Sequence, residues 1–305
     1  MLSALRAQGL SNPQIAASLA RHRSSIWREV RRNAHVTDGR YKVHKAIQHA
    51  RGRRRRSRSH PHFSPAQLRR VWQLLQLLWS PEQIAGALRA RNELLISHET
   101  IYRHIWRDHR RGGQLHRYLR CALKKKRKRY GSYERRGRLC GKRMIQQRPA
   151  HIDQRRQLGH WEIDTVLGTG SRHCIVSLVE RKSGYAQIGK LAARNAELTT
   201  ARTIELIQRH RQRFRTITAD NGTEFHGYAH IERATHVPFY FATPHHAWER
   251  GTNENTNGLI RQYLPKHTSM ARITQQHCDS IANALNTRPR KRHDYKTPEQ
   301  IFFAR

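Results

Sequence analysis

The sequence is poor in acids, in cysteine and in long hydrophobic runs. Its 305 residues include 21 Asp and Glu and four Cys. No stretch approaches the 18 consecutive apolar residues of a transmembrane helix, and the opening MLSALRAQGLS has no signal-peptide core, so we expect neither a membrane span nor secretion. The cysteines form no CxxC pair, which indicates a reducing compartment. A zinc set of His98, His104, Cys121 and Cys140 lacks the usual ligand spacing.

Basic residues are abundant and unevenly placed. The chain holds 60 Lys and Arg, for a net charge of +39, and residues 1–150 contain 37 of these cations but only 7 of the acids. Such a field predicts a polyanionic partner, because each neutralised phosphate releases condensed counterions. Nucleic acid fits better than a membrane surface, since no basic amphipathic helix flanks a hydrophobic anchor. Charge alone does not define the activity.

The segment LSNPQIAASLARHRSSIWREVRRN predicts two short helices around a tight turn. Ser11 can cap the first helix, with Pro13 in its first turn. This is helix-turn-helix patterning, in which the second helix enters the major groove. An ordinary helical hairpin is the alternative. Our candidate DNA contacts are outward side chains of the second helix, namely Ser24, Ser25, Arg28 and Arg31. Trp27 also points outward.

A second copy of this pattern lies in SPEQIAGALRARNELLISHETIYRHIW. Ser80 and Gln83 match a capping box, and Ser97 can cap the helix that begins with HET. On that second helix, Thr100 and Arg103 are the candidate DNA contacts. Two such units predict a long or composite DNA site.

Two basic runs are expected to act as flexible linkers that contact phosphates without sequence preference. They are RGRRRRSRSHPH, residues 51–62, and KKKRKRYGSYERRGR, residues 124–138. We therefore predict a first helix-turn-helix domain with its linker, a second one with its linker, and a catalytic domain, with the boundaries 1–60, 61–149 and 150–305.

After residue 150 the pattern changes to strands. HWEIDTVLG alternates apolar and polar residues, and HCIVSLVE, RKSG and YAQIGKL resemble a hairpin that continues the sheet. Residues 195–213 are expected to form a helix with one apolar stripe, and RTITAD another short strand. The predicted order is three strands, helix, strand and then helices. This order predicts a mixed α/β sheet domain. The residues expected on the helix stripe are Leu198, Ala201, Ile204 and Ile207.

Three acids occupy unusual places. Asp164 lies inside the first strand, and Asp220 ends a later strand in TADNGTEF. Glu254 lies in WERGTNENTNGLIRQ, where the glycine and asparagines are expected to form an irregular entrance to a helix whose body is GLIRQYLP. Three oxygen donors from separate elements suit Mg²⁺, which prefers hard oxygen ligands and keeps water and phosphate in its other positions. Two such ions can hold the attacking and leaving oxygens of a phosphoryl displacement.

Simpler interpretations of these acids remain open. Asp220 before Asn-Gly is good turn chemistry, and Glu254 is favoured by a helix dipole. Asp164 is harder to dismiss, because burying an unpaired charge is costly. Glu162 shares its strand face and is the chief rival, as a supporting group. The weaker candidates are Asp153 and Glu224.

These segments together resemble the DDE transposases of the insertion-sequence-thirty (IS30) family, whose catalytic core is ribonuclease-H-like. The resemblance is carried by GHWEIDTVLG, LVERKSG, TADNGTEF, FATPHHAWERGTNENTNGLIRQYLPK and LNTRPRKRHDYKTPEQIF, together with IAASLARHRSSIWREVRRN near the start. Between Asp220 and Glu254 stand 33 residues, the separation typical of this family.

The resemblance implies that Asp164, Asp220 and Glu254 form a metal-binding triad for two Mg²⁺ ions, with Mn²⁺ as a substitute. It also implies that Arg261, two helical turns after Glu254, contacts DNA. The residues expected to orient the acids or to touch the substrate are Asn221, Asn253, Asn255, Asn257 and Glu162.

The implied protein is a bacterial, cytoplasmic and nucleoid-associated transposase. It binds the terminal inverted repeats of its element, hydrolyses a strand and joins the released 3′-hydroxyl to target DNA. Bringing two DNA ends together implies a homo-oligomer, at least a dimer. The rival interpretations are a retroviral-type integrase and a catalytically inactive, transposase-derived DNA-binding regulator. Two features depart from the family pattern: Ile163 replaces an expected small residue and is expected to crowd the strand beside the metals, and little sequence precedes the first helix-turn-helix.

Overall fold

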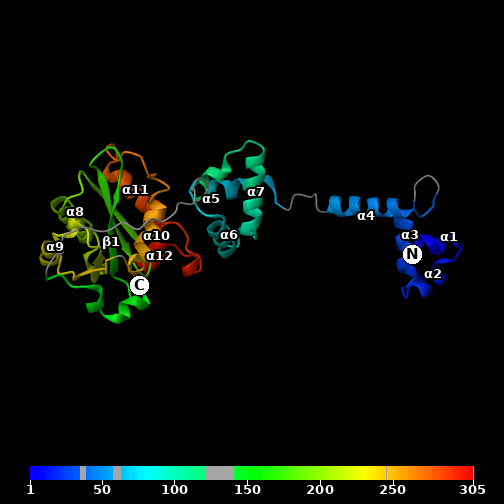
Figure 1. Cartoon of the computed structure of the whole chain (residues 1–305), viewed down its shortest axis with the longest axis horizontal. Coiled ribbons are helices and arrows are strands. Elements are labelled where there is room, and N and C mark those ends of the chain that lie inside the picture. Colours follow the sequence, from blue (N-terminus) through cyan, green and yellow to red (C-terminus); the bar gives the residue numbers. More distant parts are fainter. Residues whose placement is uncertain (35–38, 58–62, 121–140, 245, 305) are drawn as a thin grey trace. The chain divides into compact units, whose positions relative to one another are not determined.

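The structure, a computed structural model, describes residues 1–34, 39–57, 63–120, 141–244 and 246–304 (Figure 1). Its contacts divide the chain into two compact units, Met1–Ala66 and Gln67–Arg305. The second unit contains both the segment predicted to form a second helix-turn-helix and the segment predicted to carry the catalytic sheet. The domain boundary near residue 150 therefore stays a prediction.

The unit Met1–Ala66 is helical throughout its described elements. Ser11 is the N-cap of the first predicted helix, as expected, and Pro13 occupies its first turn. The Ser11 amide donates to Gln14 Oε1 at 2.9 Å, a bond of the capping-box type. The two predicted helices pack through a small core of Ile15, Ala16 and Ile26. A preceding helix, which was not predicted, adds partly buried leucines to this core. The four helices are α1 (Leu2–Ala7), α2 (Asn12–Ser18), α3 (Arg23–Asn33) and α4 (Val43–Ser57).

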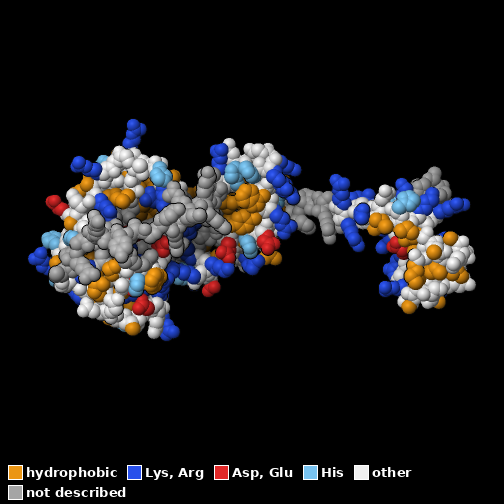
Figure 2. All heavy atoms as spheres, in the orientation of Figure 1, with side chains coloured by type: hydrophobic (Ala, Val, Ile, Leu, Met, Phe, Trp, Pro, Cys, Tyr) orange, Lys and Arg blue, Asp and Glu red, His pale blue; other side chains and the backbone are white. Residues whose placement is uncertain are grey.

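Helix α4 corrects one expectation. Residues 51–62 were predicted to form a flexible linker, but residues 51–57 are the last turns of α4, with Lys and Arg side chains along its surface (Figure 2). Arg53 fixes the helix, because its Nη2 donates to Asn33 Oδ1 at 2.9 Å. The remaining part of that run, residues 58–62, and the second predicted linker, residues 124–138, lie outside the described residues.

The two helices of the second predicted helix-turn-helix are present with the predicted caps, while their binding of DNA stays a prediction. Ser80 Oγ accepts from the Gln83 amide at 3.2 Å, and Ser97 Oγ accepts from the Thr100 amide at 3.2 Å. The apolar faces are fully buried, as the pattern predicted, and include Ile84 and Ile101. The helices here are α5 (Pro65–Gln76), α6 (Pro81–Ala90) and α7 (His98–Arg110), followed by a short 3-10 turn, Leu115–Tyr118.

A five-stranded mixed sheet forms the centre of the remaining chain, which confirms the predicted α/β fold class. The strands lie in the order β3-β2-β1-β4-β5. The first three are antiparallel neighbours, while β4 runs parallel to β1 and β5 parallel to β4. The strands are β1 (His160–Leu167), β2 (Cys174–Glu180), β3 (Ala186–Leu191), β4 (Thr216–Ala219) and β5 (Phe239–Phe241). The fifth strand was missed, because only helices were expected after β4.

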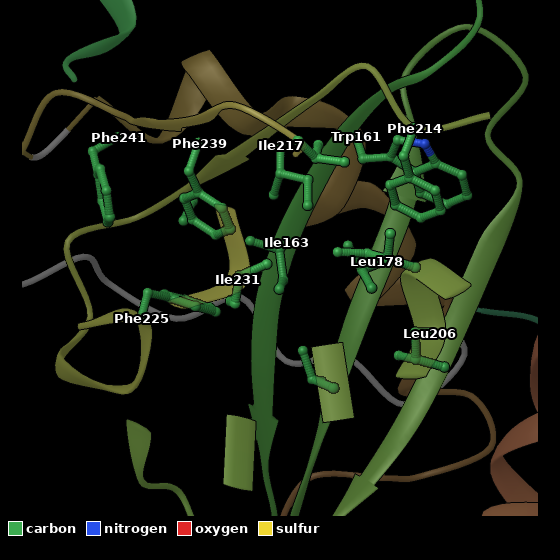
Figure 3. Packing of buried hydrophobic residues seen from close by; sticks show 14 of the residues in the cluster. Trp161, Ile163, Leu178, Leu206, Phe214, Ile217, Phe225, Ile231, Phe239 and Phe241 are labelled. Carbon is green, nitrogen blue, oxygen red and sulfur yellow. The ribbon is translucent and has the colours of Figure 1, made fainter. Parts of the chain in front are cut away.

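Helices cover both faces of the sheet. On one face, Trp161 stacks on Phe214 with ring centroids 4.2 Å apart, and this core continues to Leu206 and Ile231 (Figure 3). The opposite face packs against helices through a second core, which includes Ile260. The helices are α8 (Ala196–Gln208) and α9 (Tyr228–Thr235) on the first face, α10 (Gly251–Ile260) and α11 (Gln275–Asn286) on the second, and α12 (Pro298–Phe302).

Helix α8 buries half of the predicted stripe. Ile207 is buried and Ile204 packs against the core, as expected, but Leu198 and Ala201 are exposed, and threonines and Leu206 fill the other buried positions. The helix also ends at Gln208 and not at residue 213. The prediction was wrong for Leu198 and Ala201 because it gave the buried face to apolar side chains alone, although a threonine can bury its methyl while its hydroxyl bonds within the helix. Thr203 Oγ1 does so, by donating to the Thr199 carbonyl at 2.6 Å.

Candidate functional site

Asp164 lies in the middle of β1 with a largely covered carboxylate. Oδ1 accepts from the Thr165 amide and Oδ2 from Asn257 Nδ2, both at 2.8 Å. Burial raises the pKa of Asp164 to about 6, Arg250 opposes this shift, and the nearby Asp220 adds to it. The strand therefore presents a carboxylate whose charge needs a cationic partner.

Asp220 follows β4 and comes level with Asp164. The parallel register pairs Glu162 with Thr218, so two residues further along each strand the two aspartates lie side by side. Asp220 Oδ1 accepts from the Gly222 amide at 2.9 Å, which is the turn geometry that Asp-Asn-Gly favours. The simple turn function is thus present, and it leaves Oδ2 available for another contact.

Arg250 joins the two aspartates, and the sequence interpretation did not identify it. Its Nη1 lies 3.7 Å from Asp164 Oδ2, and its Nη2 lies 3.4 Å from Asp220 Oδ2. Arg250 ends the 3-10 turn Ala247–Arg250, directly before α10. One cationic group therefore reaches oxygens from two separate strands, which shows that these carboxylates converge on a common space.

Glu254 is placed near this pair but not in it. Its side chain is exposed in the first turn of α10. Arg250, four residues earlier, and Asn257, three residues later, both contact Asp164, so Glu254 lies on the helix face that is turned toward β1. Within the described residues, no three His, Cys, Asp or Glu side chains come together closely enough to hold a metal ion. The acidic triad therefore stays a prediction.

Helix α10 begins earlier and is more regular than expected. The glycine and asparagines before Leu259 were expected to form an irregular entrance, but Gly251 is already the first helical residue. The buried Glu162 holds this turn in place, because its Oε2 accepts from the Asn253 amide at 2.8 Å. Its Oε1 accepts from Arg181 Nε at 3.0 Å. Glu162 thus fixes the first turn of the helix that carries Glu254, and its own charge is paired with that of Arg181.

The asparagines of this region have distinct contacts. Asn257 donates to Asp164, and both Asn253 and Asn257 accept from Ser177 Oγ, at 3.3 and 3.0 Å. Asn221 donates from Nδ2 to the Ala242 carbonyl at 2.7 Å and accepts from Lys142 Nζ. The polar face of α10 is therefore bound to β1 and β2. Asn257 was predicted to orient the acids or to touch the substrate, and its hydrogen bond to Asp164 fits the first of these roles.

Glu224, one of the weaker candidates, is buried close to Asp220. It is 2 % exposed, and its Oε1 accepts from Thr165 Oγ1 at 2.7 Å and from Arg194 Nη2 at 2.7 Å. Its Oε2 has no hydrogen-bond partner in the described part of the chain. A Cβ on Gly222 would lie 2.4 Å from this oxygen and 2.9 Å from Asp220 Oδ1. Glycine is therefore needed at 222, because two carboxylates close over its α-carbon.

The candidate DNA contacts lie mainly on exposed helix faces. Arg261 is the exception, since its Nη2 donates to the Leu167 carbonyl at the end of β1, at 2.9 Å, and burial lowers its pKa. On α3, Arg28 Nε donates to the Ser24 carbonyl at 3.1 Å, and Arg31 lies over the Trp27 ring at 4.8 Å. The remaining candidates, partly or fully exposed on α3 and α7, are Ser25, Thr100 and Arg103.

Two concerns raised by the sequence have structural answers. Ile163 was expected to crowd the strand beside the metals, but it is fully buried in the core on the other face of β1, so this expectation was wrong. Cys121 and Cys140, half of the imagined zinc set, lie outside the described residues, while Cys174 and Cys278 are buried free thiols. The described helices include none long and apolar enough to cross a membrane.

Residues 2–33 match a family model described as a helix-turn-helix domain. Over 96% of its length the chain is 38% identical to the transposase for insertion sequence element IS4351 of Bacteroides fragilis and covers 90% of that protein. It is 38% identical to the transposase InsI for insertion sequence element IS30A of Escherichia coli (94% of this chain, 77% of that protein). It is 35% identical to the transposase for insertion sequence element IS1086 of Cupriavidus metallidurans (97% and 90%).

Among solved structures, 48% of the chain aligns with the catalytic core domain of BIV integrase, of which it covers 94%, at 17% identity and a TM-score of 0.38. The same share of the chain aligns with a chain of a simian T-cell lymphotropic virus intasome in complex with PP2A regulatory subunit B56 gamma. There the identity is 16%, the coverage of that chain 55% and the TM-score 0.40.

Proposed function

The chain belongs to the IS30 family of insertion-sequence transposases, and from this premise we propose that it cuts DNA at the terminal inverted repeats of its element and joins the ends to target DNA. The two helix-turn-helix segments would bind the repeats, since each presents basic or polar side chains on the exposed face of its second helix. Synapsis of two ends requires a homo-oligomer, at least a dimer.

The observation that supports catalysis most directly is the convergence of Asp164 and Asp220 on the guanidinium of Arg250. Two carboxylates that share one cationic group also suit a divalent cation, because Mg²⁺ and Mn²⁺ take carboxylate oxygens. We assign Asp164, Asp220 and Glu254 as the residues that would hold these ions. Bound there, the ions supply Lewis-acid activation of water and neutralise charge on the phosphate.

The chain's own residues hold this arrangement in position. Asn257 and the Thr165 amide fix the two oxygens of Asp164, and Glu162 fixes the first turn of α10, so the acids are held before DNA arrives. Such preorganisation is the protein's main contribution to phosphoryl transfer. In this proposal the guanidinium of Arg250 would bind a DNA phosphate beside the carboxylates, and Arg261 would contact the strand beyond the end of β1.

Nothing in the comparisons, or in the part of the chain that the structure describes, favours the alternative of a catalytically inactive regulator. The proposed activity is tested by strand cleavage of a duplex that carries the native element end, with Mg²⁺ or Mn²⁺ present. Asp164→Asn, Asp220→Asn and Glu254→Gln should each reduce cleavage by at least about a thousandfold, while binding of the end changes little. Asp279→Asn, at an exposed ion pair with Arg209, is the matched control and should cleave normally.

Full activity in any one of the three variants would remove that residue from the proposed site. An unmodified chain that binds the end but releases no cut strand with either metal would contradict the enzymatic proposal and support the regulator.

A further inference from the structure

A cavity of about 500 Å³ lies between the second helix-turn-helix and the sheet domain, inside the unit Gln67–Arg305. Two contacts hold its walls together. Gln83 Nε2 donates to the Pro289 carbonyl at 2.9 Å, and Lys291 Nζ lies 2.6 Å from Glu82 Oε1. Its volume falls within the roughly 300–1,000 Å³ typical of small-molecule sites.

The lining of this cavity includes three arginines, Arg120, Arg288 and Arg290. The side-chain hydrogen bonds that they donate all go to neutral groups. Arg288, which is 1 % exposed, donates to Gln262 Oε1 at 2.9 Å and to the Tyr263 hydroxyl at 2.8 Å.

Arg120 donates from Nη1 to Asn255 Oδ1 at 3.1 Å, and Arg290 donates from Nη2 to the Leu285 carbonyl at 3.2 Å. None of the three arginines of this lining forms a salt bridge with a carboxylate among the described residues. The described lining of the cavity also contains no Asp or Glu, so it concentrates positive charge.

The three arginines affect one another electrostatically. The pKa of Arg290 falls to about 10, first because the side chain is buried and then because Arg288, Arg292 and Arg120 repel its charge. Burial and Arg120 lower the pKa of Arg288 as well. Arg288 is buried and Arg290 half buried, and like charges in such places are unfavourable unless an opposite charge accompanies them. An anion in the cavity would supply that charge.

The lining is also aromatic. Tyr102 and Trp106, one turn apart on α7, line the cavity and remain 38 % and 45 % exposed. Trp106 follows Arg103 by three residues, so the aromatic surface lies next to this predicted DNA contact on the helix. A lining that combines aromatic rings with arginines suits a ligand that has both a planar ring and a phosphate, because bases stack on aromatic rings and guanidinium groups bind phosphate.

We propose that this cavity binds one nucleotide of the element-end DNA strand, with its phosphate on Arg288 and Arg290 and its base against Trp106 and Tyr102. The inference rests on the proposed function, because it names a subsite for the same DNA. The cavity also has Asn255 and Leu259 of α10 in its lining, and Asn255 directly follows Glu254. A nucleotide held there lies beside the helix that carries the third acid, and it connects the DNA bound by α7 with the catalytic carboxylates.

The test measures binding of thymidine 3′,5′-bisphosphate to the full chain by calorimetry. A chelator is present, so that no divalent metal ion takes part. Inorganic phosphate and thymidine are the two partial probes. The bisphosphate should bind at least about tenfold more tightly than either partial probe, since stacking and charge both contribute. Equal binding of phosphate and bisphosphate would reduce the cavity to a simple anion site and overturn the nucleotide proposal.

Two variants locate the binding. Trp106→Ala and Arg290→Gln should each weaken binding of the bisphosphate by about tenfold. The matched controls, Trp72→Ala on α5 and Arg272→Gln in an exposed turn, lie outside the cavity and should bind normally. Because Trp106 is half exposed, its removal leaves the fold intact even if Arg290→Gln does not fold. Normal binding by Trp106→Ala would overturn the assignment.

Asp164→Asn separates this inference from the proposed catalysis. It should bind the bisphosphate normally while it fails to cleave. Loss of nucleotide binding in Asp164→Asn would place the nucleotide at the carboxylates and overturn the subsite. Intact nucleotide binding in a chain that never cleaves would contradict the catalytic proposal alone.

Discussion

The arginines of Met1–Ala66 and those of Gln67–Arg305 differ in what surrounds them. In the first unit, the described arginines are exposed, apart from the half-buried Arg53. In the second unit, Arg148, Arg181 and Arg288 are 6 %, 4 % and 1 % exposed. Arginines of the second unit thus also serve the internal structure of the fold, whereas those described in the first unit lie on its surface. Net charge identifies the kind of partner but does not say which arginines touch it.

The buried network around Arg181 shows what these internal arginines do. Its Nε donates to Glu162 at 3.0 Å, its Nη1 to the Ile152 carbonyl at 3.0 Å, and its Nη2 to Asp153 at 3.2 Å. Arg148 reaches the same Asp153 and donates to Thr218 Oγ1 at 2.8 Å. Through Glu162, this network ends at the first turn of α10.

The largest expected effect comes from breaking this network. Arg181→Ala leaves the buried Glu162 without its cation, so the free energy of unfolding should fall by about 3–5 kcal/mol. Chemical denaturation of the full chain measures this change. Arg172→Ala, at an exposed position, is the control and should stay within about 0.5 kcal/mol. A loss below 1 kcal/mol for Arg181→Ala would show that the internal arginines are dispensable.

The second prediction concerns His160, which shares a buried region with these arginines. Burial first, and then Arg215 and other cations, lower its pKa from 6.5 to about 4. Because the folded pKa is depressed, the unfolded chain takes up the proton first, and stability falls as the pH drops from about 6.5 to 4. His160→Asn should remove up to about 3 kcal/mol of this pH dependence. If the free energy of unfolding of the variant falls between pH 6.5 and 4 as much as that of the unmodified chain, the prediction is wrong.

The third prediction compares one glycine from each unit, and the expected change in stability is smaller. A Cβ on Gly86 would come within 2.0 Å of the Tyr295 ring, whereas a Cβ on Gly52 of α4 meets nothing within 4 Å. Gly86→Ala should therefore destabilise its unit by about 1–3 kcal/mol. Gly52→Ala should stabilise α4 by about 0.5–1 kcal/mol, since alanine is the better helix former. Thermal melts should show shifts of opposite sign, and shifts of the same sign would be the contrary result.

The smallest stability effect is expected for the exposed arginines of α3. Arg28→Ala and Arg31→Ala should each change the free energy of unfolding by less than about 0.5 kcal/mol. Each should nevertheless weaken binding of element-end DNA and lower the salt-dependence slope by about 1, because one phosphate contact is lost. Titrations at several salt concentrations measure this slope. An unchanged slope would remove these residues from the DNA surface.

Local sequence patterns predicted those parts that local chemistry determines. Caps at Ser11, Ser80 and Ser97 located helix starts, and alternation around Asp164 located β1, because side-chain period and capping are properties of a few neighbouring residues. Strand β5 was missed because three residues are too few to show a period. Helix α4 was missed because a run of like charges was taken as a linker.

The site depended on contacts that local patterns cannot show. Arg250 reaches aspartates on two strands, and Glu224 meets Thr165 across 59 positions of sequence. Such pairings arise from the order of strands in the sheet. The residues were visible in the sequence, but their partners were not. Gly222, between Asp220 and Glu224, was a local signal of this arrangement, because the two carboxylates leave no room for a side chain there.

The central claim, that Asp164, Asp220 and Glu254 hold the same metal ions, is tested most directly by mapping the metal on the protein. Fe²⁺ in place of Mg²⁺, with peroxide and ascorbate, cuts the backbone near the bound ion. With element-end DNA bound, cuts are expected near residues 164, 220 and 254, and all of them should be lost in Asp164→Asn. Cuts near 164 and 220 without any near 254 would contradict it, and Glu254 would then remain an exposed acid of a helix start.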